Sequence, residues 1–128
     1  MTKIKTPSSI EKVSDLLQAI SPEPCLEILL AIGEGEACVC HLEARLGYRQ
    51  AYISQQLMAL REAGLLSTRR DGKYIYYRLE KPEIMEMVEL AARLAGLDMS
   101  DIVARASLSR SSCDCPKCSM QLITQSTA

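Results

Sequence analysis

Six cysteines carry the most distinctive chemistry of this 128-residue chain, and five of them fall in two short clusters. Cys38 and Cys40 flank a valine, and Cys113, Cys115 and Cys118 lie within six residues of one another. The first pair is expected where a helix begins, because backbone N–H groups and the helix dipole there favour the metal-binding thiolate. An extended entry to that helix would turn both sulfurs to one side. The alternative is that both are small core residues.

The second cluster lies in a polar, Ser-rich stretch, so packing in a core does not explain its thiols. The spacing Cys-x-Cys-x-x-Cys indicates soft-metal binding or thiol redox chemistry. All five clustered cysteines are therefore predicted metal ligands. Three sulfurs suit arsenite, antimonite or lead, and four suit cadmium or zinc; five available thiols favour cadmium and lead. Cys25 is expected in the core. His41, the only histidine, is expected to be an exposed side chain, with a role as a ligand as the alternative.

Charge is unevenly distributed along the chain, whose formal net charge is −1. The window 45–78 has seven basic and two acidic residues, a net charge of +5, so the remainder carries −6. All five tyrosines lie in the same window. A positive, tyrosine-bearing stretch on an acidic protein indicates a surface that binds phosphates. A solvated charged face would give the same count.

The apolar pattern places these residues in a mainly helical domain with one hairpin. Helical periodicity predicts four helices, over residues 10–20, 22–32, 39–46 and 50–63. Ser21 is the expected N-cap of the second helix and Gly47 the expected end of the third. Strands over 65–70 and 73–79 are joined by Asp71-Gly72, a strong hairpin signal. A long helix after Pro82 is apolar on more than one side, which predicts burial against a second subunit.

A helix, a tight turn, a helix and a basic hairpin follow the order of a winged helix-turn-helix. The predicted fold is therefore mainly α with a β-hairpin wing. The helix over 50–63 would bury Ile53, Leu57 and Leu60 and expose polar groups that can hydrogen-bond base edges. The wing would bring its cations to the phosphates beside the groove. The predicted DNA-binding residues are Arg49, Gln50, Tyr52, Ser54, Gln55, Arg69, Arg70 and Lys73.

Four runs carry a family resemblance: Ala37-Cys38-Val39-Cys40-His41-Leu42, Ile53-Ser54-Gln55-Gln56-Leu57, Leu60-Arg61-Glu62-Ala63-Gly64-Leu65 and Arg70-Asp71-Gly72-Lys73-Tyr74-Ile75-Tyr76-Tyr77-Arg78-Leu79. Over about residues 10–97 the chain resembles the ArsR/SmtB family of metal-sensing repressors. The resemblance implies a homodimer joined by its first and last helices, which binds operator DNA in the apo form and releases it when an effector binds. The Cys-Val-Cys run resembles the thiolate site of the family's arsenic, cadmium and lead sensors. Glu43 stands where many arsenic sensors have a third cysteine, so the tail is expected to complete the site.

These patterns predict a DNA-binding and dimerisation domain over 1–97 and a polar Cys-rich tail over 98–128. The predicted function is a cytoplasmic, dimeric repressor that leaves double-stranded operator DNA when its thiolates capture an ion. Cadmium or lead is favoured, arsenite or antimonite comes next, and zinc is a further candidate. One alternative is a repressor that responds to oxidants or persulfides; another is a metal-buffering or protein-binding scaffold. No membrane span, signal peptide or catalytic constellation is found, so no membrane partner and no enzymatic activity are expected.

Overall fold

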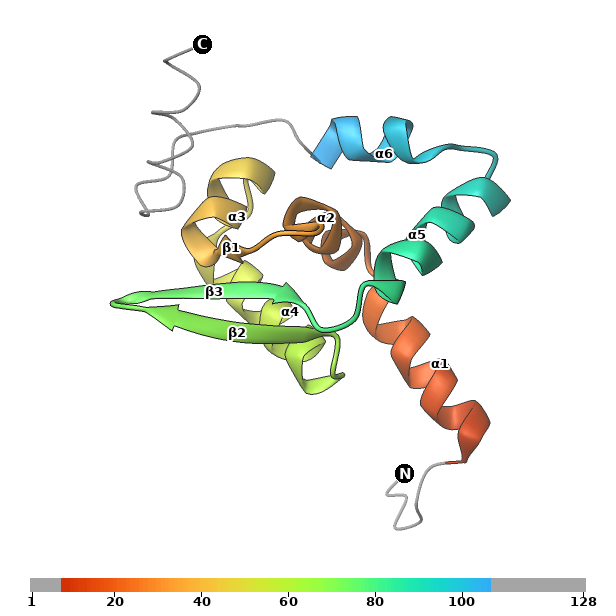
Figure 1. Cartoon of the computed structure of the whole chain (residues 1–128), viewed down its shortest axis with the longest axis horizontal. Coiled ribbons are helices and arrows are strands. Elements are labelled where there is room, and N and C mark those ends of the chain that lie inside the picture. Colours follow the sequence, from red (N-terminus) through yellow and green to blue (C-terminus); the bar gives the residue numbers. More distant parts are fainter. Residues whose placement is uncertain (1–7, 107–128) are drawn as a thin grey trace.

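The computed structural model describes residues 8–106, with side chains to residue 103 (Figure 1). The elements in chain order are α1 (Ser9–Ile20), α2 (Glu23–Ile32), β1 (Ala37–Cys38), α3 (Val39–Leu46), α4 (Gln50–Glu62), β2 (Leu66–Asp71), β3 (Tyr74–Leu79), α5 (Glu83–Leu94) and α6 (Met99–Ala106). The prediction of a mainly α fold with a β-hairpin wing is confirmed. No helix in this part of the chain has both the length and the apolar character needed to cross a bilayer.

The helix boundaries follow local capping chemistry, with one difference from expectation. Ser8 starts α1 by accepting the N–H of Glu11 at 3.2 Å. The prediction that Ser21 caps α2 is wrong, because Ser21 has helical backbone angles and its N–H bonds to the Leu17 carbonyl at the end of α1. Pro22 takes the N-cap position instead, without a side-chain hydrogen bond. Gly47 ends α3 as predicted, in the left-handed conformation with φ 79° that glycine adopts without strain.

The sheet has three antiparallel strands in the order β1-β3-β2. Two residues are too few to show periodicity, so the sequence did not predict β1. In the wing, Asp71 pairs directly with Tyr74, which makes Gly72-Lys73 the two-residue loop, one position later than expected. Gly72 has φ 62°, which suits the first loop position of a type II′ turn. The tip of the hairpin projects away from the helices, whereas its other end lies against them (Figure 1).

The main core lies among α2, α3, α4 and one face of the sheet. Its fully buried side chains are Ile28, Leu29, Leu42, Ile53, Leu57 and Leu60. A smaller cluster lies on the other face of β3, where Tyr76, Cys38 and Ala44 are buried and Cys40 and Tyr74 pack against them. We call these five residues the Cys38–Tyr76 cluster. Both faces of β3 are thus covered, which fixes its register.

The C-terminal helices pack back onto the domain. Ile84, Val88 and Ala92 recur every four residues along α5 and form its buried stripe. A short helix, α6, follows residue 97 and packs against α2. The division at residue 97 between domain and tail stays a prediction, because most of the tail lies outside the described residues.

Leu57→Ala should lower the free energy of unfolding by about 2–5 kcal/mol, because it opens a cavity in the core. The Leu57 side chain has no exposed surface. Met58→Ala is the matched control. Met58 follows Leu57 in the chain and is 62% exposed, so its truncation should change stability by at most about 0.5 kcal/mol. Urea unfolding of both variants measures the difference, and equal losses would contradict the buried face assigned to α4.

Candidate DNA-binding surface and thiol site

The polar face of α4 is formed by residues near its N-terminus. With the apolar stripe of the helix in the core, Gln50, Tyr52 and Gln55 are exposed and Ser54 is half-buried. Arg49 is exposed and is the N-cap residue, without a side-chain capping bond. These positions agree with the predicted exposure. Whether each residue contacts DNA stays a prediction.

Tyr48 tethers the turn before α4 to α2. Its hydroxyl donates to Oε1 of Glu27 at 3.2 Å, and its ring centroid lies 5.3 Å from that of Tyr52 at an interplanar angle of 51°. Burial, followed by the charge of Glu27, raises the pKa of Tyr48, so the hydroxyl remains a donor at neutral pH. The sequence pattern did not predict this role, because Tyr48 and Glu27 are 21 residues apart and share no motif.

The three wing cations differ in their partners. Arg70 and Lys73 are exposed, with Nζ of Lys73 5.5 Å from the Tyr74 ring centroid. Arg69 is half-exposed, and it donates from Nε to Oε2 of Glu36 at 2.9 Å and from Nη2 to Oε1 at 3.0 Å. The sequence pattern put the three cations in one group, whereas the structure gives Arg69 a carboxylate partner on the same chain.

The Cys38 and Cys40 side chains lie together at the start of α3. Cys38 ends β1 with extended backbone angles, φ −90° and ψ 167°, and Cys40 lies in the first turn of the helix. Their Sγ atoms are 2.8 Å apart, and the His41 N–H points to the Cys38 sulfur at 3.4 Å. Neither is in a disulfide with another described cysteine. The expectation that an extended entry brings both sulfurs to one side is confirmed.

Two adjacent thiols fit part of the coordination shell of a thiophilic ion. Within residues 8–106 no three His, Cys, Asp or Glu residues come together as a metal site, and Glu43 is exposed. His41 is half-buried rather than fully exposed as expected. The predicted ligands in the tail, Cys113, Cys115 and Cys118, lie outside the described residues.

Cys25 is a core residue, as predicted, and lies apart from the thiol pair. Its side chain is 2% exposed, and its thiol donates to Oε1 of Gln56 in α4 at 3.1 Å. Burial raises the pKa of the Cys25 thiol, so it stays protonated at neutral pH. A neutral buried thiol is a poor ligand and a poor nucleophile.

The sequence and fold match known bacterial regulators. Residues 26–68 match the family described as bacterial regulatory protein, arsR family. Over 88 residues the chain is 36% identical to the biofilm growth-associated repressor of Xylella fastidiosa (strain Temecula1), covering 69% of this chain and 77% of that protein. The chain belongs to the ArsR family. Its winged helix-turn-helix is therefore the DNA-binding fold of a transcriptional regulator.

Two further comparisons extend the ArsR-family assignment. An arsenic resistance transcriptional regulator of Pseudomonas putida is 49% identical over 61 residues, which is 48% of this chain and 47% of that protein. The structure of HlyU from Vibrio cholerae aligns with a TM-score of 0.62 and 35% identity, covering 70% of this chain and 97% of that one. The chain thus resembles an arsenic resistance regulator in sequence and HlyU in both sequence and fold.

The two parts of the DNA-binding surface should respond differently to substitution. Arg70→Ala should weaken binding to specific and random duplexes alike and reduce the salt slope by about one, because a phosphate contact is lost. Gln55→Ala should cost about 1–3 kcal/mol on the specific duplex only, because a base-edge contact is lost. Titrations at several salt concentrations, with a duplex selected for tight binding from a random pool, measure both effects.

Lys81→Ala removes an exposed cation outside the basic hairpin and serves as the control. Its affinity and salt slope should match those of the wild type. A Gln55 variant that loses the same affinity on both duplexes would exclude a role in base recognition. If Arg70→Ala kept the wild-type affinity and salt slope, Arg70 of the wing would not contact DNA.

Proposed function

We propose that this chain is a cytoplasmic repressor that binds double-stranded operator DNA as a homodimer and loses affinity when Cys38 and Cys40 bind a thiophilic ion. The observation that carries the proposal is the 2.8 Å separation of the two sulfurs. They lie at the start of α3, which packs against α4 and is joined to it by three residues. A change at the thiol pair therefore acts on the element that presents side chains to DNA.

The choice of ion rests on ligand chemistry and on the relatives. Thiolates select soft ions. Since an arsenic resistance regulator is among the relatives, trivalent arsenic and antimony, with three sulfur ligands, are our first choice. Cadmium and lead, favoured by the number of thiols, and zinc are the alternatives. We assign the remaining ligands to Cys113, Cys115 and Cys118, because no third ligand accompanies the pair within residues 8–106.

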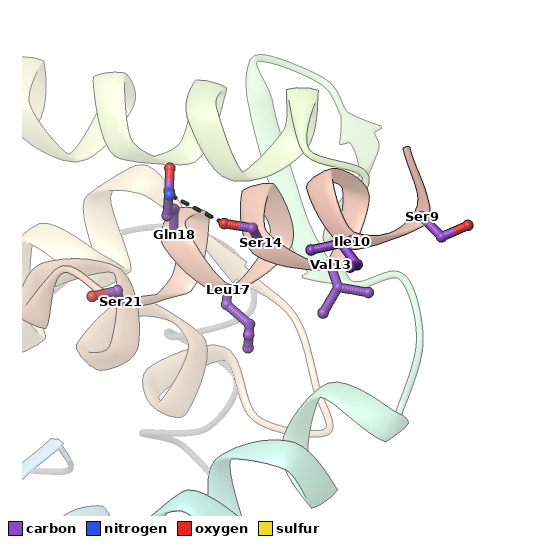
Figure 2. Close-up of a pocket in the computed structure, with 7 residues that line it drawn as sticks. All are labelled: Ser9, Ile10, Val13, Ser14, Leu17, Gln18 and Ser21. Atoms are coloured by element: carbon purple, nitrogen blue, oxygen red, sulfur yellow. Dashed lines mark hydrogen bonds between the residues drawn. The ribbon is translucent and has the colours of Figure 1, made fainter. Parts of the chain in front are cut away.

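Exposed apolar side chains on α1 and α5 support the homodimer. Ile10 on α1 and Leu94 on α5 are 82% and 83% exposed, and Val13, Leu17 and Leu90 are at least half-exposed. Figure 2 shows that Val13 and Leu17 point away from α4, on the side where α5 lies. Among the described residues, only side chains of α1 and the adjacent Ser21 line this open apolar surface, so it is available to a second chain. A second copy would bury both faces and place two α4 helices on two half-sites.

Cys38→Ser and Cys40→Ser should each keep operator binding but lose ion-induced release, because serine preserves size and removes the soft ligand. Operator binding by the reduced protein is measured while arsenite, antimonite, cadmium or lead is added. Sulfur-to-ion charge-transfer absorption reports the bound thiolates. Cys25→Ala is the control and should keep release, because its thiol lies in the core.

Truncation before Ser112 tests the tail ligands. It should weaken ion affinity and leave the unfolding transition of the domain unchanged. Release at an unchanged ion concentration would show that the tail is not part of the site. If release requires an oxidant, and mass spectrometry finds a disulfide from Cys38 or Cys40 to the tail, the redox alternative replaces the ion sensor. Failure of the reduced wild-type protein to bind any DNA would favour the scaffold alternative.

Leu94→Glu should produce a monomer at micromolar concentration and abolish operator binding, because a charge would be buried in the proposed interface. Leu94 is the position to change because it is exposed, whereas Val88 on the same helix is buried within the chain. Met58→Glu makes the same kind of change at an exposed residue outside α1 and α5 and should stay dimeric. Sedimentation velocity distinguishes the two. A wild-type protein that is monomeric at this concentration would contradict the dimer.

A further inference from the structure

A row of three side chains crosses the sheet from the thiol pair to the wing. Cys38 on β1 lies opposite Tyr76 on β3, and Tyr76 lies opposite Arg69 on β2. Directly opposite residues of antiparallel strands project to the same face, so all three side chains lie on one side of the sheet. The strand order places Tyr76 in the middle of the row.

The three side chains are in contact along this row. Tyr76 is 1% exposed and is buried in one cluster with Cys38. The guanidinium carbon of Arg69 lies 4.7 Å from the centroid of the Tyr76 ring, within the range of a cation–π interaction. The ring is thus packed between the segment that carries the first thiol and a cation of the wing.

Glu36 provides a second connection between β1 and the wing. It precedes Cys38 by two residues, and residues two apart in an extended segment project to the same face. Both of its carboxylate oxygens accept from Arg69, a two-bond geometry that fixes the plane of the guanidinium. Both anchors of Arg69 therefore depend on the position of β1.

The other arginine of the wing has no place in this row. Arg70 lies opposite Ile75, on the alternate face of the hairpin, and is exposed. The two arginines are adjacent in sequence and carry the same charge. They provide a matched pair, one connected to the thiol site and one not.

We propose that Tyr76 and Glu36 are positioning residues for Arg69, and that this row carries the effect of ion binding at Cys38 and Cys40 to the wing. The inference rests on the proposed function. A guanidinium has five N–H donors, and Glu36 accepts from two of its nitrogens, so the others remain oriented for a phosphate. Movement of Cys38 displaces the packed Tyr76 ring. It also shifts Glu36, which lies two residues earlier on the same backbone. Close packing transmits such shifts, because the ring has no space to absorb them.

The test compares the ratio of operator affinity without and with arsenite, for Arg69→Gln and Arg70→Gln. Allosteric ratios are typically about 5–150-fold, so the wild-type ratio should fall in that range. Arg70→Gln should lower both affinities and keep the ratio. Arg69→Gln should lower the affinity of the ion-free protein and reduce the ratio by about threefold or more, because the connection ends at this residue. Arsenite affinity in the absence of DNA, from charge-transfer absorption, should be the same for both variants.

Two further substitutions separate positioning from stability. Tyr76→Phe keeps the ring and should keep the ratio, whereas Tyr76→Leu should reduce it. Because Tyr76 is buried, the leucine variant can fail to fold. Glu36→Gln therefore tests the same connection at a residue that is only half-buried. Glu34→Gln changes an exposed carboxylate two residues earlier and should leave the ratio unchanged.

The outcomes distinguish this inference from the function on which it rests. A wild-type ratio of one with every ion would overturn the proposed function itself. A normal wild-type ratio that persists in Arg69→Gln and Glu36→Gln would overturn the role of the row and leave the ion sensor intact. A ratio that falls equally in Arg69→Gln and Arg70→Gln would show a general effect of wing charge and would also overturn it.

Discussion

The extended backbone of Cys38, where β1 ends and α3 begins, is the constraint on which the rest of the site depends. This one residue pairs with Tyr76 in the sheet, caps α3 through its sulfur and places that sulfur beside Cys40. A helical conformation would separate the two thiols by about 200° around the helix axis. The strand-to-helix boundary thus holds the two thiols side by side.

The helices provide a rigid support for the DNA-binding face. Leu42, Ile53, Leu57 and Leu60 have no exposed surface and fix α3 against α4. The hydrogen bond of Tyr48 to Glu27 adds a tether between the turn and α2. In the proposed sensor, a coupling free energy of about 1–3 kcal/mol between the thiol pair and α4 would change operator affinity by 5- to 150-fold.

The two arginines of the wing differ in their electrostatic surroundings. The window 45–78 is positively charged and the remainder of the chain is acidic, a distribution that favours contact of this window with a polyanion such as DNA. Glu36, from outside that window, holds Arg69 with both oxygens, while Arg70 is exposed on the other face of the strand. One arginine is therefore bonded to the segment that leads into Cys38, whereas the other lies on the alternate face of the hairpin.

Local chemistry let the sequence alone determine the helices, the hairpin and the identity of the buried stripe on α4. It also predicted that the Cys38 and Cys40 sulfurs share one side, since this depends only on where a helix starts. Helix periodicity and turn residues act over a few positions, which is why these predictions succeeded and why the boundaries at Ser21 and Gly72 were off by one residue.

Tertiary structure alone decided which distant side chains meet. β1 exists only because β3 lies beside it, and the bonds of Tyr48 to Glu27 and of Arg69 to Glu36 join residues 21 and 33 positions apart. Strand register then aligned Cys38, Tyr76 and Arg69. No local pattern encodes such pairings, because they depend on how the faces of several elements pack together.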